Sequence, residues 1–192
     1  MGFFFGEIKM NKININEINN PMKWNKYISA MKENQDNLKR ISNKVLSNIN
    51  LKNKVTELNQ KLENSNIMIL TEDFCPDSLF NLPVFILIAE LIPSIELNIF
   101  KRSENDYLNK EFISNGLDRI PAVLILNKDN QIKYKWQEKP AKAYKAQEEI
   151  LNKIKNVKGI SKSDIKKKYY YESEIQYENN LWIETINEIH KL

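Results

Sequence analysis

Apolar residues recur at helical spacings over the first third of the chain. From Trp24 to Ile49 they lie three, four or seven positions apart, which places them on one face of a helix. The pattern resumes after a break near residues 48–50 and ends at Asn64. We therefore predict a helical segment over residues 22–64. Its apolar stripe is typical of helices that pack on the core of their own protein, which we favour over a partner-binding coiled coil.

The middle of the chain changes its periodicity. Ile67–Thr71 is a short, almost wholly apolar run, as expected of a strand buried on both faces, and Leu79–Leu91 reads as a helix that is apolar nearly all round. Ile95–Phe100 alternates as a strand does, and a polar helix over Asp106–Ser114 stops before an Asn-Gly pair. This alternation of strand and helix predicts a parallel βαβ unit.

The pattern then becomes antiparallel. Two strands, Ala122–Leu126 and Gln131–Trp136, flank the Asn- and Asp-rich residues 127–130, a composition that favours a hairpin turn. We predict a helix over Ala141–Val157 and a helical tail over residues 166–192, in which apolar residues again recur at helical spacing. The fold class is therefore α/β, with a central mixed sheet flanked by helices and with added N-terminal and C-terminal helices.

Length and composition fit one domain with additions. The 192 residues are 42% hydrophobic and include only 4 glycines and 6 prolines, which argues against a disordered chain. The single cysteine excludes an intrachain disulfide and suits a reducing cytoplasm, where we expect the protein to reside. The net charge of +4 permits binding to nucleic acid but does not demand it.

Residues 1–21 carry no targeting signal that we can identify. Their apolar run is too short for a signal peptide or a membrane span. We expect this segment to be disordered or to reflect a mis-assigned start, with natural translation beginning at Met10. N-terminal sequencing of the native protein tests this, since a native Met1 excludes it.

Cys75 is the principal candidate for a reactive residue, because it lies between the end of the first predicted strand and the start of the following helix. The unpaired N–H groups and the positive dipole at a helix start both favour the thiolate, which is the nucleophilic form. Ser78 can donate a hydrogen bond to the sulfur, whereas the charge of Asp77 opposes a second negative charge. The sequence does not rank these effects. A buried, inert thiol remains the alternative interpretation.

The arrangement of one cysteine and two prolines along the chain resembles that of proteins with the thioredoxin fold. Cys75 opens the first helix of the βαβ unit, Pro83 follows where thioredoxins carry a helix-kinking proline, and Ile120-Pro121 precedes the antiparallel strand where they carry a cis-proline. The resemblance covers roughly Ile67 to Val157. More narrowly, the chain resembles a bacterial subfamily of thioredoxin-like proteins that has a helical extension before the domain. The residues that carry this resemblance are Phe74-Cys75-Pro76-Asp77, Leu82-Pro83, Ser103-Glu104-Asn105, Asn115-Gly116 and Ile120-Pro121.

The resemblance implies a division of the chain and a substrate surface. It places the thioredoxin-like domain at residues 67–158. In the resembled fold, a cis-proline loop lies against the thiol and holds an extended substrate segment beside it. It therefore implies substrate-binding residues around the thiol, which are Phe74, Pro76, Ile120 and Pro121.

Two departures from thioredoxin limit the chemistry. Ser78 stands where the second cysteine belongs, so this chain cannot resolve a mixed disulfide by itself. Ile69 stands where thioredoxins place a buried acid that assists proton transfer. The leading hypothesis is thus monothiol exchange, with catalytic roles for Cys75, Asp77 and Ser78 and with a low-molecular-weight thiol or a partner protein as the second reactant. The rival hypothesis is a redox-inactive binding module for a protein or small-molecule partner.

The single histidine and the lysine-rich segment do not indicate further functional sites. His190 is the only histidine, and together with one cysteine it cannot form a structural zinc site, so we expect no metal and no cofactor. Ten lysines over residues 139–168, followed by three tyrosines, permit nucleic-acid binding. We favour a solvated helix face instead, and we expect no membrane association.

Overall fold

The computed structural model describes residues 12–155 and 161–191. Within these residues, four strands form one mixed sheet in the order β2-β1-β3-β4. β1 runs parallel to β2 and antiparallel to β3, and β4 pairs antiparallel with β3. The strands are β1 (Asn66–Thr71), β2 (Glu96–Lys101), β3 (Ala122–Leu126) and β4 (Ile132–Gln137). The mixed sheet and the parallel unit predicted from the sequence are therefore confirmed.

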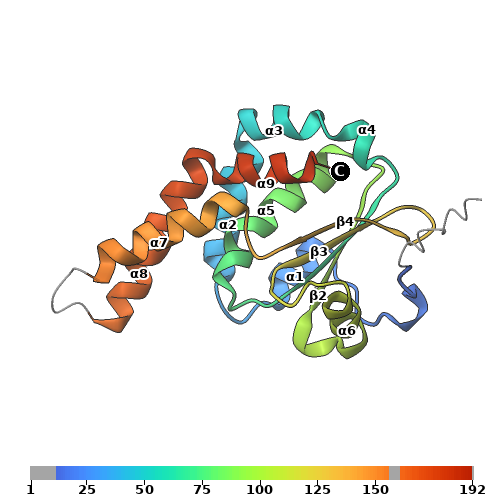
Figure 1. The fold of residues 1–192 in the computed structure, drawn as a ribbon, viewed down its shortest axis with the longest axis horizontal. Helices are drawn as coiled ribbons and strands as arrows, with labels where there is room; N and C mark the ends of the chain where they lie inside the picture. The colour runs from blue at the N-terminus through green and yellow to red at the C-terminus, as the bar shows by residue number, and fades with distance from the viewer. Residues whose placement is uncertain (1–11, 156–160, 192) are drawn as a thin grey trace, which may run out of the picture.

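Helices cover both faces of this sheet. Figure 1 shows α6 on one face and α5, with α3 and α9 above it, on the other, while α7 and α8 project together to one side. The α-helices are α1 (Trp24–Ala30), α2 (Gln35–Ser47), α3 (Ile49–Thr56), α4 (Asn59–Leu62), α5 (Pro76–Leu91), α6 (Asp106–Ser114), α7 (Ala141–Lys155), α8 (Lys162–Gln176) and α9 (Trp182–Ile189).

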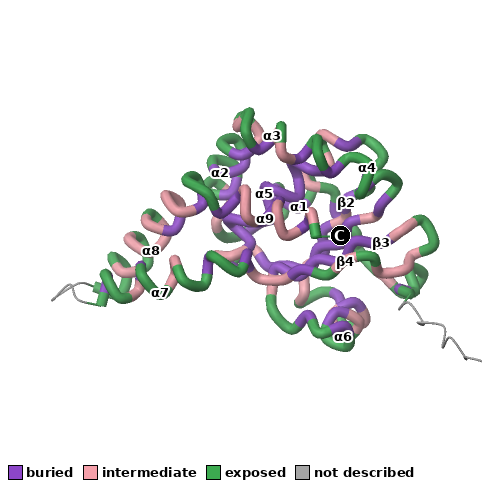
Figure 2. The backbone as a smooth tube through the Cα atoms, turned by 45° about the horizontal axis from the view of Figure 1, so that its top comes forward, coloured by how far each residue is buried: buried purple, intermediate pink, exposed green. Residues whose placement is uncertain are grey.

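The two central strands, β1 and β3, are apolar on both faces because each face packs against helices. Successive residues of β1 alternate between two buried clusters: Ile67 and Ile69 face the cluster around α5, whereas Met68 and Leu70 face the cluster around α6. Figure 2 shows the resulting burial along the central strands and α5, in contrast to α7 and α8, where most residues are exposed or intermediate. A near-continuous apolar run in β1 is the consequence of this double coverage.

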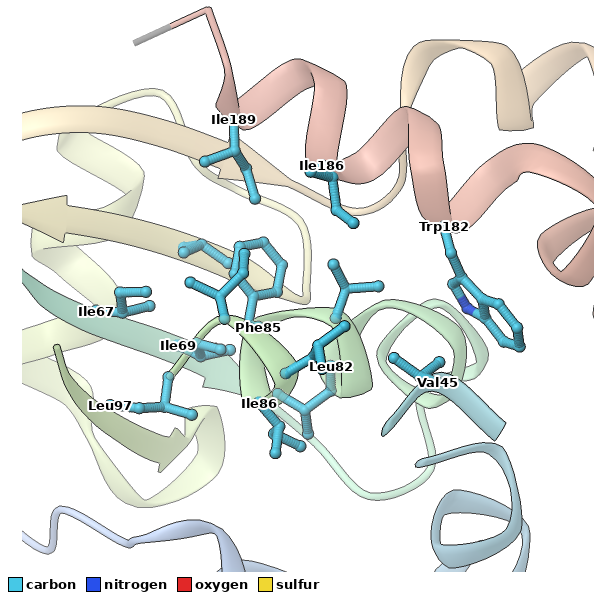
Figure 3. Close-up of a cluster of buried hydrophobic side chains, with 14 of the residues drawn as sticks. Val45, Ile67, Ile69, Leu82, Phe85, Ile86, Leu97, Trp182, Ile186 and Ile189 are labelled. Atoms are coloured by element: carbon cyan, nitrogen blue, oxygen red, sulfur yellow. The ribbon is translucent and has the colours of Figure 1, made fainter. Parts of the chain in front are cut away.

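The helices added at the two ends of the chain share the core of the central domain. Figure 3 shows Val45 of α2 and Trp182 of α9 pointing to the same cluster as Phe85 of α5 and Ile69 of β1. Each of these side chains is at most 2% exposed. The N-terminal and C-terminal helices therefore belong to one hydrophobic core with the sheet.

Local sequence signals set several helix boundaries. The break expected near residues 48–50 is real, because α2 ends at Ser47 and the side chain of Asn48 accepts a hydrogen bond from the N–H of Leu51 at the start of α3. α8 begins at Lys162, ahead of the expected tail, because Ser161 caps it by accepting from the N–H of Asp164 at 3.1 Å.

The segment before α1 differs from the expectation of disorder over the residues that the structure describes. Ile13 is 1% exposed, and its N–H donates to the carbonyl of Asn130 at 3.0 Å. Met22 exchanges two backbone hydrogen bonds of 2.9 Å with Ile99 at the edge of β2. The expected start at Met10, with the rest of residues 1–11, lies outside the described residues, as does the end of the predicted helix at Val157.

Candidate functional site

Cys75 is held immediately before the first residue of α5 by its backbone. The residue is the N-cap of the helix, with φ −76° and ψ 120°, and Pro76 occupies the first turn, where a missing N–H costs nothing. The Cys75 N–H donates to the carbonyl of Glu72 at 3.3 Å, and the Cys75 carbonyl accepts from the N–H of Leu79 at 3.2 Å. Residues 72–75 thus connect the end of β1 to α5, and the thiol lies at the end of this short connection.

The loop before β3 covers the thiol. Cys75 is 7% exposed, and its Sγ donates to the carbonyl oxygen of Ile120 at 3.4 Å. The peptide bond between Ile120 and Pro121 is cis. The structure therefore brings Cys75, Ile120 and Pro121 together as the sequence resemblance implies.

Burial decides the acidity of the thiol. Burial raises the pKa of Cys75 above its ordinary value, and the charge of Asp77 raises it further. Hydrogen bonds from the side chain and the backbone N–H of Ser78 lower this pKa but do not offset burial. The thiolate stabilisation expected at a helix start is therefore outweighed by burial of the sulfur.

Ser78 belongs to a chain of hydroxyl groups that leads away from the sulfur. Its Oγ lies 2.6 Å from Oγ1 of Thr71, which donates to it, and both side chains are buried. Thr71 in turn shares a hydrogen bond with the hydroxyl of Tyr27, whose pKa is raised mainly by burial. The sequence analysis missed Tyr27 and Thr71, because helical and strand periodicity mark them only as core positions.

Asp77 faces a buried lysine on the far side of the helix start. The Nζ of Lys139 lies 3.6 Å from Oδ2 of Asp77, and the Lys139 side chain is 4% exposed. Burial raises the pKa of Asp77 to about 6, although the charge of Lys139 opposes this shift. Lys139 was one of ten lysines that we assigned to a solvated face, so its burial was not predicted.

Glu138 links this lysine to the cis-proline loop. Its N–H donates to the carbonyl of Pro121 at 2.7 Å from a backbone with φ +63°, and its carboxylate accepts from Lys139 at 3.1 Å and from Arg119 at 2.8 Å. Burial alone raises the pKa of Glu138, but the hydrogen bonds from Arg119, Tyr144 and Lys139 make the net shift a lowering. Glu138 is therefore held as a carboxylate beside the loop that covers the thiol.

The remaining predicted site residues lie around the start of α5. Phe74 is 56% exposed, so its ring is free to contact another molecule. Pro76 and Ile120 are half-buried, and Pro121 is buried. All seven residues singled out from the sequence thus lie at the start of α5 or on the loop that covers it.

Family comparison agrees with this architecture. A family model described as thioredoxin matches residues 21–156. The chain belongs to the thioredoxin family. The match begins before α1, so the N-terminal helices are part of what this family model describes.

Solved structures support the thioredoxin-like fold at low sequence identity. A protein of unknown function from Pseudomonas aeruginosa is 17% identical, with a TM-score of 0.56, over 83% of this chain and 90% of its own. An HIV epitope-scaffold is also 17% identical, with a TM-score of 0.57, over 90% of this chain and 94% of its own. No curated protein matches the chain. These likenesses extend over most of both chains and concern the fold.

In this thioredoxin-like domain, the C-terminal helices close the back of the site. The amide nitrogen of Asn81, one turn after Asp77, donates to the Asp77 carbonyl at 2.9 Å and is 2.9 Å from the hydroxyl of Tyr177. The ring of Tyr177 stacks on Phe80 at 4.8 Å, and Thr185 donates to the amide oxygen of Asn81 at 3.0 Å. The sequence analysis missed Asn81 and Tyr177 because their contact spans 96 residues.

We expect Tyr177→Phe to destabilise the protein modestly. The variant keeps the stacking on Phe80 but removes the hydroxyl contact with the buried Asn81, which costs about 1 kcal/mol. Urea unfolding at pH 7 measures the change, with Tyr171→Phe, on a ring that is 65% exposed, as the matched control. Equal stability of both variants and the wild type would show that the Asn81 contact contributes nothing.

Among the described residues, no group of three or more His, Cys, Asp or Glu side chains is arranged to hold a metal ion, and no described helix is long and apolar enough to cross a membrane. His190 lies 3.7 Å from the carboxylate of Glu57 rather than beside Cys75.

Proposed function

We propose that this thioredoxin-family protein carries out monothiol exchange through Cys75, with the external thiol supplied by a reducing bacterial cytoplasm. The observation that carries the proposal is the 3.4 Å contact between the sulfur and the carbonyl of Ile120, next to cis-Pro121. A substrate that pairs with the loop at this point lies against the sulfur. Displacement of the Ile120 contact by substrate would also release the thiol for reaction.

The exchange needs no second cysteine in the chain. The Cys75 thiolate attacks one sulfur of a disulfide, the old S–S bond breaks, and the other half leaves as a thiolate that takes a proton from water. A second thiol then attacks the mixed disulfide and regenerates Cys75. The raised pKa makes the thiolate scarce at neutral pH but intrinsically more nucleophilic, because nucleophilicity rises with pKa.

One observation favours the redox-inactive binding module as a second candidate. The thiol is only 7% exposed, while the neighbouring Phe74 is 56% exposed, so a partner meets the aromatic ring before the sulfur. In that function the surface formed by Phe74, Pro76 and Ile120 binds a protein or a small molecule without covalent exchange.

We expect Cys75 to react with a small disulfide faster as the pH rises. Bis(2-hydroxyethyl) disulfide should give one mixed-disulfide adduct on the folded protein, detected by mass spectrometry. Its rate should reach half its maximum above about pH 8.5, the pKa of free cysteine, because burial raises the pKa of Cys75. Added thiol should reverse the adduct.

Cys75→Ser is the control, and circular dichroism establishes that it is folded. The proposal is wrong if the folded wild type forms no adduct up to pH 10 while the urea-unfolded protein does. In that case an unchanged function of Cys75→Ser favours the binding module.

A further inference from the structure

A cavity of about 470 Å³ lies between α2 and α8. This volume is within the range of pockets that hold small organic molecules. Its walls come from the start of α2, where Asn34 and Arg40 line it, and from one face of α8, where Lys166, Lys167, Tyr170 and Tyr171 line it. The remaining lining residues, Asn37, Ser163 and Glu174, are polar, so the aromatic surface of the cavity comes from its two tyrosines and lies beside a cationic rim.

The charges around the cavity leave a positive excess. Among the described residues, Glu174 is the only acidic one that lines the cavity, and its carboxylate accepts from Nη2 of Arg40 at 2.7 Å and from Nζ of Lys44 at 2.7 Å. Hydrogen bonding from Arg40, with Lys44 adding to it, lowers the pKa of Glu174 to about 2 against the effect of burial. Among the described residues, Lys166 and Lys167 have no carboxylate partner, so their charges remain available to an anion.

The cavity lies next to the thiol. Asn34 lines both this cavity and the small closed space around Cys75, and its amide donates to the carbonyl of Asp73 at 3.0 Å. The ring of Tyr170 lies 6.2 Å from that of Phe80 on α5. The Tyr170 hydroxyl is close enough to the sulfur that, after burial, the charge of Cys75 is the next largest cause of its raised pKa.

We infer that this cavity binds a low-molecular-weight disulfide, or the matching thiol, that carries carboxylate or phosphate groups. Lys166 and Lys167 hold the anionic groups, Tyr170 and Tyr171 contact the organic part, and the sulfur end points past Asn34 to Cys75. The inference rests on the proposed function and names its substrate class. The exchange is the one written above, in which the ligand's S–S bond breaks as the bond to Cys75 forms.

Binding can be measured without chemistry in the full-length Cys75→Ser protein. Titration calorimetry with glutathione disulfide tests carboxylate groups, coenzyme A disulfide tests phosphate groups, and bis(2-hydroxyethyl) disulfide is the uncharged comparison. We expect at least one charged probe to bind more tightly than the uncharged one, with an affinity that falls as salt is added.

The double variant Lys166→Ala/Lys167→Ala, made in the Cys75→Ser background, locates the site. We expect its Kd for the charged probe to rise roughly tenfold, as two surface charges are lost. The matched control is Lys153→Ala/Lys155→Ala, two exposed lysines of α7 outside the cavity lining, for which we expect an unchanged Kd.

Two results would overturn the inference: neither charged probe binds, or both double variants bind equally well. These results are distinct from a failure of the proposed function, which appears as the absence of any adduct on wild-type Cys75 with the uncharged disulfide. A charged probe that binds through Lys166 and Lys167 supports the cavity assignment whatever the reactivity of Cys75.

Discussion

Trp182→Ala is expected to lower the free energy of unfolding by about 3–5 kcal/mol. The side chain is 2% exposed and lies in the cluster shared by α2, α5 and the sheet. Its indole Nε1 donates to the carbonyl of Phe80 at 2.9 Å, in a buried position. Truncation leaves a cavity and also removes the indole hydrogen bond to that carbonyl, so the two losses add. Urea unfolding followed by circular dichroism measures the change.

Trp182→Phe and Ile49→Ala are the matched variants. Phenylalanine keeps most of the apolar volume, so we expect a smaller loss. Ile49 is 71% exposed, and its truncation should change stability by no more than about 0.5 kcal/mol. We also expect one cooperative transition, since α9 shares its core with the sheet. A loss below about 1 kcal/mol for Trp182→Ala would contradict the placement of α9 in the core.

The central domain could be predicted from the sequence because its strands are short apolar runs with clear ends. The expected strand Ala122–Leu126 coincides with β3, and the expected helix Asp106–Ser114 coincides with α6. These elements follow from local patterns, in which residue type reports burial directly. The order of Ile13, within residues 1–21 where we expected disorder, was not predicted, because its hydrogen bond is to Asn130, a distant residue that periodicity does not reveal.

The candidate site was only partly accessible to sequence reasoning, for a related reason. The position of Cys75 at a helix start is a local property and was predicted. The raised pKa of the thiol comes from burial by segments that are distant in the sequence, among them Tyr27, Leu38 and Ile120, so the balance between burial and the helix dipole is fixed only by the tertiary structure. Lys139 shows the same limitation, since one buried lysine cannot be told from nine others by composition.

The buried pair of Asp77 and Lys139 should make stability depend on pH. Burial raises the pKa of Asp77 from 3.8 to about 6, with the charge of Glu138 adding to burial and that of Lys139 opposing it. Between about pH 4 and pH 6, the native state therefore binds more protons than the unfolded state, so stability falls as the pH rises through this window. The loss attributable to this carboxyl is about 3 kcal/mol and persists above pH 6.

We expect Asp77→Asn to be more stable than the wild type at pH 8, by up to about 3 kcal/mol, and to match it near pH 4. The variant removes the ionisation that burial opposes, and Lys139 keeps Glu138 as a partner at 3.1 Å. Urea unfolding at pH 4, 5, 6 and 8 gives the difference between the two proteins, with the exposed Asp118→Asn as the matched control. A difference that is the same at every pH, or an asparagine variant that is less stable at pH 8, would mean that Lys139 compensates the Asp77 charge fully. Asp77 would then be a structural anion of the site, whereas the expected result makes it a carboxyl that exchanges a proton beside Cys75 near neutral pH.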